Sequence, residues 1–121
     1  MTPAQEVRAR ELIDKQVAMS GKTLEALRKA GLTDEQEVQL DFFFDAPNEK
    51  SARALAEHLQ ASYCLDVRCE KSPGFLSRKW IVTGKSYPTP VTVQVLAEWI
   101  PWIVVQGISH ACEFDGWGAA V

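Results

Sequence analysis

The sequence predicts an α+β domain, and two observations lead to that class. Apolar and polar residues alternate in some segments with the period of two that a half-buried strand requires, and other segments repeat apolar residues at helical spacing. At 121 residues, with 46% hydrophobic and 24% charged residues, the chain is long enough for one core without disulfides or a structural metal. We expect a single structural unit, with a helical extension over 1–33 and a sheet-containing domain over 34–121.

The first third of the chain predicts two helices. Helix formers fill residues 3–18, and their apolar members recur at roughly helical spacing. We expect Ser20-Gly21 to break this helix. A second short helix then begins at Thr23 and ends at Gly31, which suits a C-cap.

The remainder predicts six further elements in the order β-α-β-β-α-β. They are a strand at 38–45, a helix at 49–60, strands at 65–70 and 78–84, a helix at 91–109 that Pro101 kinks or divides, and a strand at 110–114 that leads into an Asp115-Gly116 turn. This is the split order of ferredoxin-like folds, in which two helices cover one face of a four-stranded antiparallel sheet. The other face of the sheet is then exposed to solvent or covered by another part of the chain or by a partner.

The charge distribution indicates which classes of partner to expect, and the first residues bear on the cellular location. The net charge of −3 divides into six basic and four acidic groups in residues 1–33 against seven basic and twelve acidic groups in residues 34–121. An acidic main domain argues against a nucleic-acid partner. The first residues lack a secretory signal, and the apolar run at 91–108 is interrupted by polar residues and a proline. We therefore expect a cytoplasmic protein that does not enter a membrane.

No constellation typical of catalysis or of metal binding stands out. His58 and His110 lie outside recognisable motifs, and each is expected to be structural or exposed. Cys64, Cys69 and Cys112 cannot all pair and are expected to be reduced thiols. Glycine-rich phosphate loops do not occur. We predict no catalytic residue, no metal and no cofactor, and direct RNA binding through Phe43 is a minor hypothesis because Asp41 and Asp45 flank it.

A protein-binding surface is the strongest functional hypothesis. It would combine the open sheet face with the last motif of the chain, and its candidate residues are Phe43, Trp80, Asp115, Gly116, Trp117 and Gly118. Two alternatives remain at this point. Trp117 packs on its own domain, or the open face is covered by the N-terminal helices or by a second copy in a homodimer.

Four segments carry a resemblance to a known family: residues 23–31, the aromatic strand at 40–44, the helix at 51–59 and the ending Phe114-Asp115-Gly116-Trp117-Gly118. Together they resemble the RraB family, the regulators of ribonuclease E activity B. The resemblance implies a non-enzymatic ferredoxin-like domain that acts by binding a protein, which for the family's namesake is the ribonuclease E that it inhibits. Compared with the namesake branch, we expect a more neutral, tail-less member of that family. A small-molecule sensor and a structural dimerisation module are the alternatives.

Overall fold

The computed structural model describes residues 1–74 and 78–120, so the expected tail-less ending at Val121 lies outside the described part. Three helices and six strands alternate along these residues. In chain order they are α1 (Pro3–Lys29), β1 (Glu37–Val38), β2 (Asp41–Ala46), α2 (Glu49–Ser62), β3 (Leu65–Lys71), β4 (Trp80–Lys85), β5 (Thr89–Pro90), α3 (Val93–Ile108) and β6 (Glu113–Gly118).

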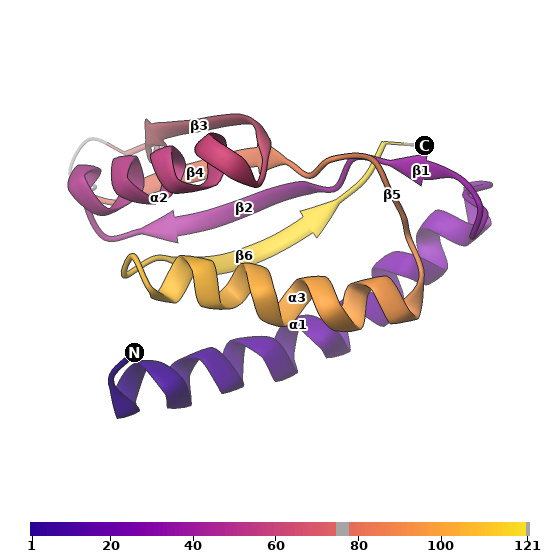
Figure 1. Ribbon diagram of the computed structural model, residues 1–121, viewed down its shortest axis with the longest axis horizontal. Helices are drawn as coiled ribbons and strands as arrows, with labels where there is room; N and C mark the ends of the chain where they lie inside the picture. The colour runs from indigo at the N-terminus through magenta and orange to yellow at the C-terminus, as the bar shows by residue number, and fades with distance from the viewer. Residues whose placement is uncertain (75–77, 121) are drawn as a thin grey trace.

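The strands form one four-stranded antiparallel sheet in the order β3-β4-β2-β6, and β1 pairs separately with β5. Helices α2 and α3 cover one face of the larger sheet, and α1 lies along the outer side of α3 (Figure 1). The predicted α+β class is therefore confirmed. The opposite face of the sheet carries no helix among the described residues, and we call it the open face.

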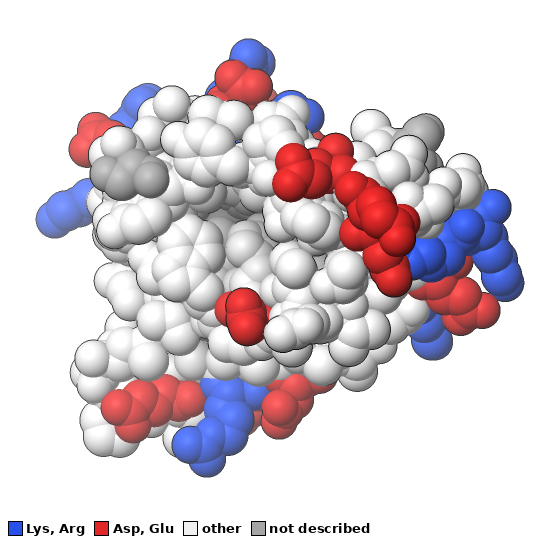
Figure 2. Space-filling view, turned by 45° about the vertical axis from the view of Figure 1, so that its right-hand side comes forward, with Lys and Arg blue, Asp and Glu red and all other residues white. Residues whose placement is uncertain are grey.

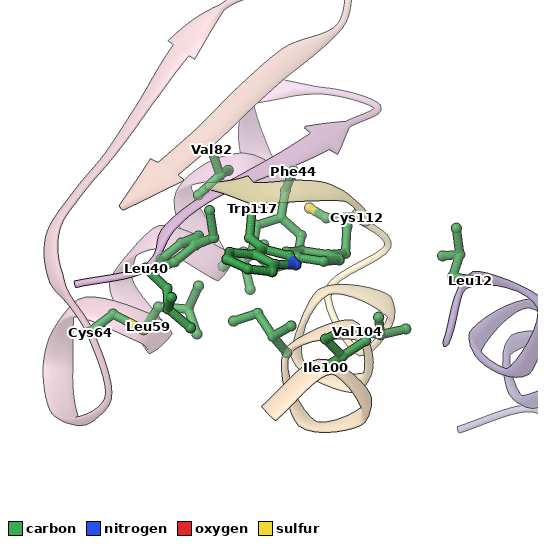
Figure 3. Packing of buried hydrophobic residues seen from close by; sticks show 14 of the residues in the cluster. Leu12, Leu40, Phe44, Leu59, Cys64, Val82, Ile100, Val104, Cys112 and Trp117 are labelled. Atoms are coloured by element: carbon green, nitrogen blue, oxygen red, sulfur yellow. The ribbon is translucent and has the colours of Figure 1, made fainter. Parts of the chain in front are cut away.

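The core lies between the sheet and the two helices that cover it. Phe42 and Phe44 of β2 are fully buried and meet edge to face, with ring centroids 5.8 Å apart. Figure 3 shows side chains of β2, α2 and α3 converging on this layer. The alternation expected at 38–45 is confirmed, although the segment divides into β1 and β2, with the fully buried Leu40 just before β2.

Helix α1 runs unbroken from Pro3 to Lys29, so the predicted break at Ser20-Gly21 is wrong. A glycine inside a helix costs only about 1 kcal/mol, and tertiary contacts outweigh that cost here. The Ser20 hydroxyl donates to the Gln16 carbonyl at 2.7 Å, one helical turn back, so the helical backbone continues through the serine. Leu12 and Leu27, on either side of Ser20, are both buried in the core cluster.

Helix α3 is also a single element, although Pro101 lies in its interior. Thr92 caps its first turn by accepting from the Val95 amide at 3.1 Å, so the helix begins two residues later than predicted. The proline removes one backbone donor, a cost of about 3 kcal/mol. Burial of Ile100 and Ile103 on either side of the proline offsets this cost, because both side chains are removed from water.

The last strand begins later and ends later than predicted. His110 and Ala111 belong to the turn after α3, where the Gly107 carbonyl accepts from the amides of His110 and Cys112, each at 2.9 Å. Ala111 takes a left-handed backbone with φ +60 at this turn. The strand therefore starts at Glu113 and includes the Asp115-Gly116 pair that was expected to end it.

The two edges of the sheet differ in what accompanies them. Helix α1 runs beside β6, with Arg8 bound to Glu113 near one end and Ser20 bound to Trp117 near the other. Strand β3 lies at the opposite edge (Figure 1). Across residues 1–74 and 78–120, no helix combines the length and apolar character that a membrane crossing needs.

Candidate functional site

The open face presents one aromatic side chain near its middle. Phe43 of β2 is 42% exposed, whereas its neighbours Phe42 and Phe44 point to the helices and are fully buried. Across the sheet, Phe43 lies opposite Thr83 of β4 on one side and Gly116 of β6 on the other. Since glycine has no side chain, the β6 residue that pairs with Phe43 does not cover the ring.

A hollow of about 230 Å³ lies beside this ring, between α1 and the β2–β6 pair. We call it the Phe43 hollow. Its lining combines four residues of α1 with four from the two strands, namely Gln16, Met19, Ser20, Thr23, Phe43, Asp115, Gly116 and Trp117. Four of the six residues predicted for a partner site, Phe43, Asp115, Gly116 and Trp117, therefore line one hollow.

The Asp115-Gly116 pair forms a β-bulge rather than the terminal turn that was predicted. Phe44 pairs with Phe114 and Phe43 pairs with Gly116, which leaves Asp115 as the extra residue on β6. Gly116 has φ +144, a backbone region that side-chain-bearing residues rarely adopt. The bulge directs the Asp115 side chain to solvent while the strand continues to Gly118.

Trp117 belongs mainly to the core. Its side chain lies on the helix-covered face opposite Phe42, and only 9% of the residue is exposed. Its Nε1 donates to the Ser20 hydroxyl of α1 at 2.8 Å, so the buried indole nitrogen has a hydrogen-bond partner. This geometry supports the interpretation that Trp117 packs on its own domain. Part of the residue also lines the Phe43 hollow.

Three carboxylates, those of Asp45, Glu113 and Asp115, lie close together near the Phe43 hollow. Partial burial raises the pKa of Asp45, and the nearby charges of Asp115 and Glu113 raise it further. The Arg8 guanidinium holds Glu113 with bonds of 2.7 and 2.8 Å and lowers the pKa of that carboxyl. Asp115 is exposed, so its negative charge stands at the rim of the Phe43 hollow.

Two predicted residues lie elsewhere. Trp80 pairs with Ala46 on the helix-covered face, where the Arg53 guanidinium of α2 stacks 5.5 Å from its ring centre. Gly118 pairs with Asp41 at the end of β6. The strand registers therefore do not bring Phe43, Trp80 and Trp117 into one patch, because Phe43 points to the face opposite the other two.

Sequence reasoning missed the part of the hollow that α1 supplies. Gln16 and Ser20 are polar yet almost fully buried, on the same stripe as Leu12 and Leu27. The signal was present: a helix continued past Ser20 places these two polar side chains inside an otherwise apolar stripe. Buried polar groups need partners, so that pattern indicates a contact with another element.

The two histidines, which sequence analysis treated separately, meet between α2 and the turn after α3. Their rings lie 5.0 Å apart, and both bind Gln106: His58 Nε2 contacts its Oε1 at 2.6 Å and His110 Nδ1 its carbonyl at 3.0 Å. Burial raises the pKa of Cys64 and of Cys112 to about 11, so both thiols stay protonated at neutral pH. In the described part of the chain, no three His, Cys, Asp or Glu side chains cluster as a metal site requires.

A sensor function would need a ligand cavity between the N-terminal helix and the rest of the domain. The apolar hollow between α1 and α3 has a volume of about 120 Å³ and is lined by Val17, Ser20, Gly21, Leu24, Val93, Leu96, Ala97 and Ile100. Small-molecule sites typically measure about 300–1,000 Å³. This hollow and the Phe43 hollow, which lies between α1 and the sheet, are both smaller than that range, whereas two surface hollows of about 390 and 430 Å³ lie against β3, away from α1.

The face drawn in Figure 2 carries lysines, arginines and carboxylates of mixed sign, mostly along its margins, around a largely uncharged middle. It lacks the continuous basic field that a phosphate backbone requires, as far as the described residues extend. Comparison with protein-family models and with curated proteins finds no match for this chain.

Proposed function

We propose that this chain is a non-enzymatic regulatory protein that binds another protein through the open face at the Phe43 hollow. The exposure of Phe43 is the observation that carries the proposal. A large aromatic ring that is 42% exposed in the middle of a sheet face, beside a 230 Å³ hollow, suits an apolar side chain of a partner.

Charge around the hollow favours a basic partner segment. Asp115 is exposed at the rim of the hollow, and Asp45 and Glu113 lie near it, while Arg8 and Lys79 offset part of the charge of these two neighbours. Lys and Arg side chains flanking an apolar anchor would complement the negative charge of Asp115, and a nucleic-acid backbone would be repelled. The family resemblance makes ribonuclease E the named candidate partner, in a cytoplasmic complex that slows RNA cleavage.

The strand order supports a finer fold assignment within this proposal. We assign the domain to the ferredoxin-like βαββαβ folds, because β2, β3, β4 and β6 occupy the order β3-β4-β2-β6 with every neighbouring pair antiparallel. In such a fold the face opposite the helices is free for recognition. Here α1 lies at the β6 edge of the sheet and adds one wall to the Phe43 hollow.

The test is a binding titration of the purified protein against ribonuclease E from the same organism, followed by an RNA cleavage assay. Phe43→Ser should weaken binding at least tenfold, as expected for the loss of an aromatic anchor worth about 2 kcal/mol. Tyr87→Ser is the matched control, since Tyr87 is 54% exposed and does not line the hollow. Equal binding by both variants would refute the assignment of the site.

A folded wild-type protein that does not bind ribonuclease E would remove that partner from the proposal. Affinity capture with the wild-type chain and with Phe43→Ser would then separate the two remaining questions. A protein retained by the wild type and lost with Phe43→Ser keeps the site and changes the partner. Proteins retained equally by both would overturn the site itself.

A further inference from the structure

Strand β3 forms an edge of the sheet that none of the described strands pairs with on its outer side. The edge at β6 differs, because Arg8 and Ser20 of α1 bind Glu113 and Trp117 of that strand. An edge strand presents a row of backbone N–H and C=O groups that another strand can pair with. The sequence of β3, Leu65–Lys71, places exposed charges of both signs along this row.

Two hydrogen bonds show which backbone groups face outward. The Ser72 amide donates to the Lys79 carbonyl at 2.9 Å, toward the neighbouring side of the hairpin, whereas the Val67 amide donates to Gln60 Oε1 at 2.9 Å, outside the ladder. Because this direction alternates over the regularly paired residues 68–71, Cys69 and Lys71 turn their N–H and C=O groups away from β4. Val67 follows a bulge between Leu65 and Arg68, and its bond to Gln60 shows that its N–H also points outward. These residues offer the edge to a further strand.

The side chains on either side of Cys69 indicate which strand would pair with this edge. Arg68 pairs with Thr83 and Glu70 with Ile81, so both are exposed on the open face and flank Cys69 with opposite charges. In an antiparallel pair centred on Cys69, each Arg68 lies opposite Glu70 of the other strand. Centring on Arg68 or on Glu70 would place like charges opposite each other. We propose that β3 pairs with β3 of a second copy, antiparallel and centred on Cys69.

A register centred on Val67 conflicts with the hydrogen bond between the Val67 amide and Gln60. Centring on Val67 would require its amide to donate to the second copy, but Gln60 Oε1 already accepts from that amide. In the register centred on Cys69, two bonds join the Cys69 residues, and each Lys71 amide donates to Val67 of the other copy. Val67 then keeps its bond to Gln60. The two four-stranded sheets become one continuous sheet with both Phe43 rings on the same face.

Charges on an edge strand can also prevent pairing with another chain. Charge reversal distinguishes a strand that pairs with a second copy from one whose charges prevent pairing. Sedimentation velocity of the wild type should show a concentration-dependent dimer. Arg68→Glu places two like-charged pairs in the interface and should weaken the dimer about tenfold, and the double variant Arg68→Glu/Glu70→Arg should restore it. Arg78→Glu, a reversal at an exposed position outside β3, is the matched control and should leave the dimer unchanged.

A thiol cross-link tests the register without any charge change. Cys64 and Cys112 are buried, whereas Cys69 is half-buried at the proposed centre. A short bismaleimide should join two wild-type chains and should fail with Cys69→Ser. The inference is overturned by a wild type that stays monomeric at about 1 mM. It is equally overturned by a dimer that Arg68→Glu does not weaken, that the double variant does not restore, or that Cys69 does not cross-link.

Discussion

Three consecutive phenylalanines of β2 face two different environments. Phe42 and Phe44 are fully buried beneath the helices, while Phe43 between them is 42% exposed on the open face. The residue type is the same, and the backbone conformation is that of one strand. Only the face differs, so the same ring serves the core at two positions and remains available for recognition at the third.

This contrast separates stability from binding within one strand. Removing a ring from the helix-covered face leaves a cavity, because surrounding side chains cannot fully collapse into it. Removing the ring from the open face leaves only solvent-exposed surface. Variants on the two faces should therefore differ most in the free energy of unfolding.

The largest loss is expected for Phe44→Ala. The Phe44 ring meets Phe42 at 5.8 Å and Phe114 at 5.5 Å, both edge to face. The substitution should cost about 3–5 kcal/mol of unfolding free energy, since transfer and cavity terms add. Urea unfolding followed by far-UV circular dichroism measures it. A cost below about 1 kcal/mol would contradict the account of this core.

Trp117 tests whether the last strand belongs to the helix-covered face. Trp117→Ala should cost about 3 kcal/mol, because only 9% of the residue is exposed. Trp117→Phe should cost about 1–2 kcal/mol, because it removes the bond from Nε1 to the Ser20 hydroxyl and part of the buried ring volume. A double-mutant cycle with Ser20→Ala isolates that bond. Full stability of Trp117→Ala would instead support an exposed anchor.

Glu113→Gln should lower the free energy of unfolding by a smaller amount, and this loss should depend on pH. Arg8 lowers the pKa of Glu113 below its ordinary value of 4.5 in the folded protein. The pair therefore adds stability at pH values above 4.5, and this contribution disappears as the pH falls through the folded pKa. Glu113→Gln should cost less than about 1 kcal/mol at pH 7, because both side chains are about half exposed.

Unfolding curves recorded from pH 7 to pH 3 check this prediction. The wild type and Glu113→Gln should converge in stability at the acid end. Glu98→Gln is the control, because Glu98 is an exposed carboxylate on α3. A difference that persists at pH 3 would show that the substitution acts through packing instead of through the ion pair.

Phe43→Ser should give the smallest change in stability. The ring lies opposite Thr83 and the side-chain-free Gly116, so few contacts are lost. We expect a change within about 0.5 kcal/mol, typical of exposed positions. The same urea titration used for Phe44→Ala measures it. A loss of several kcal/mol would show that Phe43 is part of the core and would remove the basis of the binding proposal.

Local pattern predicted most of the fold. The period of two in β2 and the stripe of Ala52, Leu55 and Leu59 in α2 are properties of neighbouring residues, and both are confirmed by burial. The errors occurred where distant contacts override local preference. Ser20-Gly21 was predicted to break a helix and Pro101 to kink or divide one, yet α1 continues through Ser20-Gly21 and α3 is not divided, because packing and hydrogen bonding outweigh the local cost.

For the candidate site, the sequence predicted four residues of the hollow and missed the α1 wall. Trp80 could not be assigned to a face, because its side follows from the pairing of β4 with β2, which joins residues far apart in the chain. The bulge at Asp115 likewise depends on register with β2. Cross-strand register is a tertiary property, and a shift of one residue exchanges the two faces.

By itself, the sequence determined the class of the domain, the order of its main elements and the alternation that buries Phe42 and Phe44. Those properties follow from the spacing of apolar residues along the chain. Only the tertiary structure decided that α1 continues past Ser20, that Trp117 binds it, and that Phe43 stands beside a hollow. Each of these depends on contacts between residues that are distant in sequence, whose free energies outweigh local preferences.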